Sequence, residues 1–205
     1  MFVQVIRGKG TDREAIRSAV DRWVAELGPG AAGWLGSTSG LTEQNELFAM
    51  VRFTSQEVAS TNSTRPEQGR WWAEMEKLLD GEATFQDTAN VIVHSQGDLN
   101  SATFVQVMFG KSSDLQRLET LMADTLSIRQ AARPDIIGNV AVGFEDGLFV
   151  NVVYFTSEAE ARAAEGQSPT AEVRSILAEM TALQVAPIDY LDIKDPWLKQ
   201  PRSSS

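Results

Sequence analysis

The residues best suited to chemistry in this sequence are one arginine, the single histidine and a group of tryptophans. Four of the five tryptophans lie in the first half of the chain. A guanidinium and an imidazole beside large indoles can bind a planar acidic ligand, because the rings stack and the cation forms a charge-assisted hydrogen bond. The candidate ligand-binding residues in this half are Trp34, Arg52, Trp71, Trp72 and His94.

The same residues also allow a purely structural interpretation. Tryptophans at helical spacing usually belong to a core, so Trp23 and one of the pair Trp71 and Trp72 could serve packing alone. Arg52 would then be a solvated residue at the edge of a strand, and His94 would begin a linker. The sequence leaves both interpretations open.

Three amide side chains stand inside predicted strands, at Gln4, Gln106 and Asn151. Asparagine is disfavoured in strands, and a buried amide needs a hydrogen-bond partner. Asn151 is therefore either a satisfied core amide or a further ligand-binding residue that lines a pocket.

The composition excludes several kinds of site. The chain has no cysteine, which excludes a thiolate nucleophile, a disulfide and a zinc or iron–sulfur centre held by cysteines. One histidine cannot supply the several imidazoles of a histidine-rich metal site. We therefore expect neither a metal nor another cofactor.

Charge and hydropathy restrict the partners. The formal net charge is −10 and no basic stripe is present, which argues against binding to a nucleic acid backbone. No segment approaches the roughly 18 apolar residues of a membrane helix, and the start MFVQV lacks the features of a signal peptide. The sequence predicts a cytoplasmic protein with a small-molecule ligand as its partner.

Two glycine motifs resemble nucleotide-binding loops without meeting their requirements. Residues 28–33 match G-x-G-x-x-G, but they follow a predicted helix and open a predicted strand, whereas a dinucleotide loop follows a strand and opens a helix. Residues 110–112 read Gly-Lys-Ser, but Val105 stands where a P-loop needs its first glycine. Both segments are predicted to be turns.

The chain is a tandem repeat. Residues 2–9 read FVQVIRGK and residues 104–111 read FVQVMFGK. The offset of 102 residues (104 minus 2) also relates Phe53-Thr54-Ser55 to Phe155-Thr156-Ser157. Two homologous units of roughly 100 residues are the simplest explanation.

Each unit reads β-α-β-β-α-β. Thr11 and Ser113 each open a predicted capping box, and the residues after them form one apolar helical stripe. Second helices are expected to begin at Ser55 and Ser157 and to be interrupted by Pro66 and Pro169. The predicted strands are 2–8, 34–40, 46–53 and 83–93 in the first unit, and 104–110, 136–142, 148–155 and 185–193 in the second.

This order predicts an α+β fold of two tandem ferredoxin-like units, each with the sheet order 4-1-3-2 and both helices on one face. The third strands are apolar on both faces, so each sheet needs a second cover. We expect the other unit's sheet to provide it, which gives a dimeric-type α/β barrel within one chain.

The expected segments are a first unit over residues 1–95, a linker over 96–102, a second unit over 103–193 and a polar tail over 194–205. The expected state is a monomeric pseudo-dimer, with a further homodimer left open.

On these residues the chain resembles the dimeric α+β barrel superfamily, which includes the antibiotic-biosynthesis and haem-degrading monooxygenases. The likeness rests on the FVQV…GK…D openings, FTS after the third strand and a second helix that is broken and bears tryptophan. It covers both halves and implies a ligand cavity between sheet and helices in each unit.

The haem-degrading members pair an asparagine of the first strand with a tryptophan and a histidine of the second helix. Here the corresponding first-strand position holds Val3 or Gln4, and the helix after the tryptophans has no histidine. The antibiotic-type members act without a cofactor on electron-rich aromatic substrates.

The resemblance therefore implies a small-molecule-binding protein with a cofactor-independent monooxygenase activity toward a small aromatic or polyketide-like compound. The alternative is a non-catalytic ligand-binding or structural protein with a degenerate site.

The repeat also predicts which half holds the ligand. The positions of Trp34 and Arg52 correspond to Ile136 and Tyr154 in the second unit, so we expect the more substantial pocket in residues 2–94.

Overall fold

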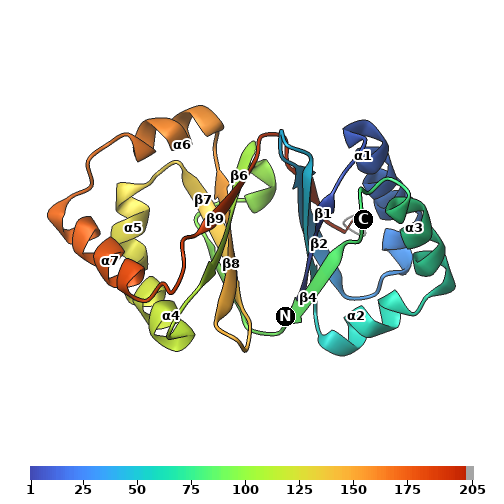
Figure 1. Cartoon of the computed structure of the whole chain (residues 1–205), viewed down its shortest axis with the longest axis horizontal. Coiled ribbons are helices and arrows are strands. Elements are labelled where there is room, and N and C mark those ends of the chain that lie inside the picture. The colour runs from blue at the N-terminus through green and yellow to red at the C-terminus, as the bar shows by residue number, and fades with distance from the viewer. Residues whose placement is uncertain (202–205) are drawn as a thin grey trace. The chain divides into compact units, whose positions relative to one another are not determined.

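A computed structural model describes residues 1–201 of the chain. It contains two compact units, one made of Met1–Val91 together with the segment from Asp195 onward, and one made of Ile92–Lys194. Each unit has one antiparallel five-stranded sheet. In each unit the helices lie on one face of the sheet (Figure 1). The predicted order of elements, β-α-β-β-α-β, is confirmed in both.

The elements of the first half are β1 (Phe2–Lys9), α1 (Arg13–Arg22), a π-helical turn (Trp23–Leu27), a 3-10 turn (Gly28–Gly30), β2 (Trp34–Leu41), β3 (Glu46–Phe53), α2 (Gln56–Ser63), α3 (Pro66–Glu76) and β4 (Thr84–Thr88). After β5 (Val91–Ser95) and a 3-10 turn (Leu99–Ser101) follow β6 (Phe104–Lys111), α4 (Leu115–Asp124), α5 (Leu126–Ala132), β7 (Ile136–Gly143), β8 (Leu148–Phe155), α6 (Glu158–Glu165), α7 (Ala171–Ala182), β9 (Asp189–Ile193) and β10 (Trp197–Lys199).

The sheet orders are β4-β1-β3-β2-β10 and β9-β6-β8-β7-β5. The predicted order 4-1-3-2 is therefore confirmed in each unit, with one added strand beyond the second. The two registers are equivalent, since Phe2 lies opposite Phe53 and Phe104 lies opposite Phe155. The repeated segment is the central strand of each sheet, which explains why it is the best-matched part of the two halves.

Because of the added strands β5 and β10, the boundaries of the two observed units differ from those of the expected segments. The closing strand expected over 83–93 is two strands, β4 and β5, and β5 joins the sheet of the second unit beside β7. The expected polar tail contains β10, which pairs with β2 of the first unit. Within that tail Trp197 is only 2% exposed. A buried indole and a paired backbone explain why this segment is ordered despite its polar composition.

The first helix of each unit begins one residue later than the capping boxes predict. The side chain of Asp12 accepts a hydrogen bond from the amide of Ala15 at 3.0 Å, whereas the Thr11 hydroxyl donates to the carbonyl of Leu78. Asp114 likewise accepts from the amide of Arg117 at 2.8 Å. The aspartate is the better cap here because its negative charge also complements the helix N-terminus.

A bulge in β2 decides which side chains face the helices. Trp34 lies opposite Phe53 and Gly36 lies opposite Arg52, so one residue is extra between them. Gly36 has a φ of 129°, and a Cβ there would lie 2.7 Å from the carbonyl oxygen of Lys199. Glycine is therefore required at this position. The bulge places Trp34 and Ser37 on the same side of the sheet.

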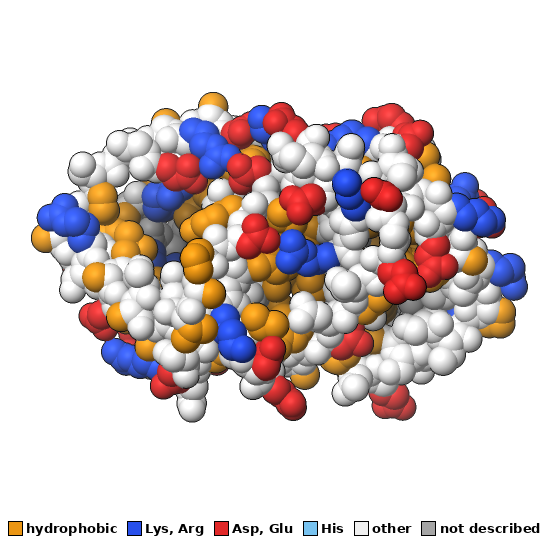
Figure 2. Space-filling view, viewed as in Figure 1, with side chains coloured by type: hydrophobic (Ala, Val, Ile, Leu, Met, Phe, Trp, Pro, Cys, Tyr) orange, Lys and Arg blue, Asp and Glu red, His pale blue; other side chains and the backbone are white. Residues whose placement is uncertain are grey.

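The described part of the chain carries mixed charges and no membrane-length apolar helix. On the face in Figure 2, acidic and basic side chains alternate rather than forming an area of one sign. No helix within residues 1–201 has both the length and the hydropathy to cross a bilayer.

Candidate functional site

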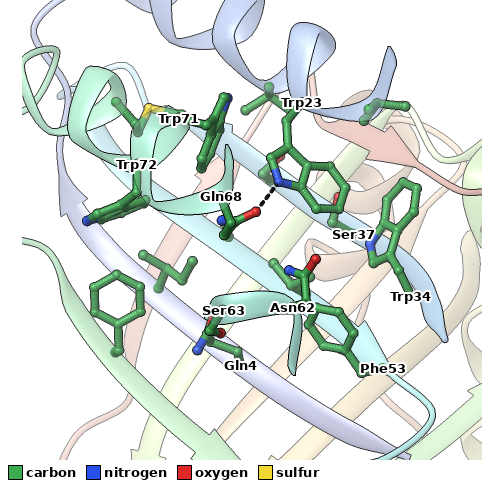
Figure 3. Close-up of a pocket in the computed structure, with 18 of the residues that line it drawn as sticks. Gln4, Trp23, Trp34, Ser37, Phe53, Asn62, Ser63, Gln68, Trp71 and Trp72 are labelled. Carbon is green, nitrogen blue, oxygen red and sulfur yellow. Dashed lines mark hydrogen bonds between the residues drawn. The ribbon is translucent and has the colours of Figure 1, made fainter. Parts of the chain in front are cut away.

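A cavity of about 300 Å³ lies between the sheet and the helices of the first unit. Its floor consists of side chains from β1, β2 and β3, and its walls come from α1, the π-helical turn, α2, α3 and β4 (Figure 3). The lining residues are Gln4, Ile6, Val20, Trp23, Val24, Trp34, Ser37, Ser39, Leu47, Ala49, Val51, Phe53, Asn62, Ser63, Gln68, Gly69, Trp71, Trp72, Met75 and Phe85. The cavity is thus mainly apolar with a few amides and hydroxyls, as is typical of small-molecule sites.

A continuous row of five aromatic rings forms one side of the cavity. The ring centroids are 4.9 Å apart for Trp23 and Trp34, 6.5 Å for Trp23 and Trp71, 6.0 Å for Trp71 and Trp72, and 5.0 Å for Trp72 and Phe85. Three of these four contacts are edge-to-face, which is a preferred geometry for aromatic pairs. The rings hold one another in place and offer flat apolar surface to a ligand.

Three of the four indole N–H groups in this row have an acceptor, and the fourth has none. Trp23 donates to Oε1 of Gln68 at 2.6 Å, Trp71 to the carbonyl of Ala19 at 2.8 Å and Trp72 to Oε1 of Glu76 at 2.7 Å. Nε1 of Trp34 is shielded from solvent and has no partner among residues 1–201. Figure 3 shows this nitrogen directed toward the interior of the cavity. A buried N–H normally finds an acceptor, and for this one the described residues supply none.

The polar groups of the cavity are amides and hydroxyls. Asn62 is buried, and its Oδ1 accepts a hydrogen bond from Arg65 at 2.9 Å. Arg65 is itself held by Glu67 at 2.8 Å and by the carbonyl of Leu27 at 3.2 Å. This network fixes the Asn62 amide so that its NH₂ group remains available to the cavity. None of the residues that line the cavity carries an ionisable acid, amine, guanidinium or imidazole.

The structure brings three of the six predicted site residues together. Trp34, Trp71 and Trp72 line the cavity. Arg52 does not, because β3 points Leu47, Ala49, Val51 and Phe53 into the cavity and its even-numbered residues to the opposite face. The prediction that Arg52 binds the ligand beside Trp34 does not fit this cavity, and the parity of the strand is the reason.

His94 and Asn151 belong to the second unit. His94 lies in β5, whose partner is β7, and it is not among the residues that line the cavity of the first unit. Oδ1 of Asn151 accepts from Nδ2 of Asn139 at 2.8 Å, and its own Nδ2 lies 3.8 Å from the sulfur of Met108. Of the two interpretations of Asn151, the structure shows the satisfied amide.

Sequence reasoning did not single out Gln68 and Asn62 as cavity residues. Gln68 precedes Trp71 by three residues and Trp72 by four, which places it on the same helical face as both. That spacing was sufficient to identify it. Asn62 lies on α2, whose polar sequence QEVASTNS has no apolar stripe strong enough to mark its inner face.

In the second unit, larger side chains stand at positions that line the floor of the cavity in the first unit. At the offset of 102 residues, Leu47 corresponds to Phe149 and Ala49 to Asn151. Phe149 packs so closely that a Cβ on Gly110 would lie 2.3 Å from its ring. A cavity beside His94 in the second unit has a volume of about 30 Å³. The larger cavity therefore lies in the half where the repeat comparison places it.

Burial of His94 gives the stability of the protein a pH dependence. Desolvation, and secondarily the charge of Arg129, lowers the pKa of His94 below the usual value for histidine. The unfolded chain therefore binds a proton at a higher pH than the folded chain, and stability falls as the pH falls through that range. We expect wild type to lose unfolding free energy relative to His94→Gln between pH 7.5 and about pH 5.5. Urea unfolding at both pH values tests this, and parallel losses in the two proteins would contradict it.

No protein-family model matches the sequence. No curated protein matches it either. Solved structures do match along almost the whole chain. A protein from Lactobacillus acidophilus with a provisional monooxygenase assignment has a TM-score of 0.72 and 9% identity, with 96% of this chain and 98% of that chain covered.

Two further solved structures show the same likeness. A protein from Fusobacterium nucleatum, also provisionally assigned as a monooxygenase, has a TM-score of 0.77 and 8% identity over 97% of this chain and 94% of its own. An anthrone oxidase-like protein has a TM-score of 0.67 and 10% identity over 97% of this chain and 92% of its own. At these identities the likeness concerns the fold. The chain therefore has the tandem ferredoxin-like fold of these monooxygenase-like proteins, as the sequence resemblance predicted.

Proposed function

We propose that the cavity of the first unit binds a small, neutral, planar molecule that carries a carbonyl or phenol oxygen. The observation that carries this proposal is a cavity walled by aromatic rings, one of which belongs to Trp34, whose buried Nε1 has no acceptor among residues 1–201. An oxygen of the ligand would accept this N–H, and its rings would lie against the tryptophans. The volume of about 300 Å³ is at the lower end of the range for ligand pockets.

The ligand is neutral because the cavity offers no counter-ion. The lining residues are apolar, amide or hydroxyl side chains, and burying an unpaired charge among them would be costly. This changes the ligand class that the sequence suggested, since the planar acid was matched to Arg52, which faces away from the cavity. A planar ketone or phenol fits the groups that are present.

A second candidate function is cofactor-independent oxygenation of such a molecule. In this reaction a methylene carbon beside an electron-rich ring system would be oxidised by O₂, R₂CH₂ + O₂ giving R₂C=O + H₂O. The fold shared with monooxygenase-like proteins favours this candidate. The cavity contains no general base, so the substrate would need an acidic C–H of its own. The Trp34 N–H and the Asn62 amide would stabilise the enolate oxygen that forms, as donors placed at a developing charge do.

Binding is tested by titrating the protein with 2-naphthol and anthrone while tryptophan fluorescence is recorded. We expect saturable quenching in wild type. Trp34→Phe keeps an aromatic ring and removes the unpaired N–H, and should weaken binding by about fivefold, because a neutral hydrogen bond contributes roughly 1 kcal/mol.

Trp72→Phe is the matched control. It also removes one indole N–H from the aromatic row, but that N–H already donates to Glu76, so affinity should stay within about twofold of wild type. Equal losses in the two variants would assign the effect to general packing and contradict the role of Trp34. Absence of saturable quenching in wild type would refute the proposed ligand class.

The oxygenase candidate has a separate readout. Anthrone at saturating concentration in air-equilibrated buffer should consume one O₂ for each quinone-type product formed, measured with an oxygen electrode. If anthrone binds but oxygen uptake does not exceed the rate without protein, the proposed binding function stands and the proposed oxygenase activity is contradicted.

A further inference from the structure

The second unit contains a small cavity of about 30 Å³ with a different chemical character from that of the first. It lies between β5, β7 and the helix α5. Its lining residues are His94, Gln96, Leu126, Arg129, Gln130, Arg133, Ile136, Gly138 and Asn139. Two of these are arginines and one is the histidine, and none is an acid. The cavity therefore gathers cationic groups in a protein whose net charge is −10.

Arg129 has no anionic partner within residues 1–201. Its Nη2 donates to the carbonyl of Met122 at 2.7 Å and its Nε to the hydroxyl of Thr125 at 3.3 Å. These groups satisfy hydrogen bonds but carry no net charge. Burial lowers the pKa of Arg129, which reflects the cost of keeping a cation there without a counter-ion.

Arg133, on the same cavity, shows the contrast. It forms two hydrogen bonds to the carboxylate of Asp135, at 2.9 and 2.7 Å, and its charge is thereby balanced. The pKa of Arg133 is raised, first by this hydrogen bond with Asp135. Arg129 is thus the cation of this cavity that lacks compensation.

The repeat shows that Arg129 is not required by the fold. The offset of 102 residues pairs Arg129 with Leu27 of the first unit, which is buried in an apolar cluster. A leucine therefore suffices at this position of a ferredoxin-like unit. The second unit carries a partly buried cation there instead, and a cation in that place needs an anion.

His94 supplies a second free donor at the same place. Its Nε2 is shielded from solvent and has no hydrogen-bond partner among residues 1–201. Arg129 and His94 line the same small cavity, and the charge of Arg129 contributes to the lowered pKa of His94. The charged or titratable groups around the cavity include Arg129, His94 and the pair of Arg133 and Asp135, and the carboxylate of Glu165 also acts on Arg133. A buried orphan donor beside an unbalanced cation is the arrangement that an anion completes.

We propose that this cavity of the second unit binds a small oxyanion of carboxylate size, through the guanidinium of Arg129 and Nε2–H of His94. The volume exceeds the roughly 10–15 Å³ that one water requires, and formate is the smallest carboxylate that can be tried there. The carboxylate would remove the unbalanced charge and satisfy the orphan nitrogen together. It would also favour the protonated imidazole, so anion affinity rises as the pH falls.

The single histidine makes this proposal directly measurable. In a proton–carbon NMR spectrum of the full-length protein, the only imidazole signals are those of His94. We would titrate sodium formate at constant ionic strength, with sodium chloride as the balancing salt. Wild type should show a saturable shift of these signals, and the pKa of His94 should rise when formate is bound.

Two arginine variants supply the comparison. Arg129→Gln should weaken formate binding by about tenfold or more, because it removes a charge-assisted contact. Arg117→Gln removes an exposed arginine from α4 whose partner is Glu179, and should leave the titration unchanged. Arg129→Lys keeps the positive charge and should retain part of the affinity. It therefore serves as a second test if Arg129→Gln does not fold.

The outcomes separate clearly. A wild-type protein whose His94 signals do not move saturably with formate overturns the proposal, whatever the variants do. The same holds if Arg129→Gln folds and responds as wild type does, or if chloride alone produces the same shift, since the effect would then be ionic screening. The ligand proposed for the aromatic cavity plays no part in this experiment, so the two proposals stand or fall separately.

Discussion

Replacement of Trp197 by alanine is expected to lower the free energy of unfolding by about 3–5 kcal/mol, the range for truncating a large buried aromatic side chain. Trp197 lies in the last strand, β10, and is 2% exposed. It packs in a cluster with residues of α1, β2 and β3, among them Ile16, Leu41 and Leu47. Alanine would leave a cavity at the edge of the first sheet, and chemical denaturation would measure the loss.

Two further variants identify the cause of that loss. Trp197→Phe keeps most of the apolar surface and removes an indole N–H that has no acceptor in the described residues, so it should retain most of the stability. Leu198→Ala truncates the neighbouring side chain, which is only partly buried, and should cost clearly less than Trp197→Ala. If Leu198→Ala is as harmful as Trp197→Ala, burial of the indole is not the specific cause of the loss.

The importance of Trp197 could not be derived from the local sequence. β10 has three residues and stands in a segment rich in polar residues and proline, so neither periodicity nor propensity marks it as a strand. Its partner in β2 is Ser39, about 160 residues earlier in the chain. Pairing over such a distance is set by the tertiary structure. The sheet order itself was predictable, because it follows from the repeat and from the handedness of β-α-β connections.

In the candidate site, too, some positions follow from the local sequence pattern and others depend on the tertiary structure. Trp71 and Trp72 could be identified because a helix repeats its face every three to four residues. Arg52 and Trp34 could not be assigned to opposite faces without the bulge at Gly36, which shifts the register of β2 against β3. His94 was misplaced because the break between β4 and β5 turns one predicted strand into two, in different sheets.

The two units illustrate how a duplicated fold can develop different sites. Both keep the sheet register, since Gln4 contacts Asp87 and Gln106 contacts Asp192 in the same way. The residues between sheet and helices differ. The first unit has small floor residues and large aromatic walls, whereas the second has a large floor residue in Phe149 and a cation at Arg129. The first therefore suits a neutral planar ligand, and the second suits a small anion.

Ala49→Phe is expected to weaken ligand binding strongly in the first unit without loss of stability. Ala49 lies on β3 in the floor of the aromatic cavity, at the position where the second unit has Asn151. A phenyl ring suits a strand and would extend into the empty space toward the tryptophans. A ligand would then have to displace it or overpack the cavity, and overpacking costs about 1–3 kcal/mol or more. Affinity for 2-naphthol should therefore fall by about a hundredfold.

The stability of the variant separates filling of the cavity from damage to the fold. Filling a void usually leaves stability unchanged or raises it by about 0.5–2 kcal/mol, so the melting temperature of Ala49→Phe should not fall below that of wild type. Ala49→Ser is the matched control, because it adds one hydroxyl and almost no volume, and it should bind the ligand nearly as wild type does. An Ala49→Phe protein that is stable and still binds 2-naphthol with wild-type affinity would place the ligand outside this cavity. Fluorescence titration and thermal unfolding of the three proteins decide between these outcomes.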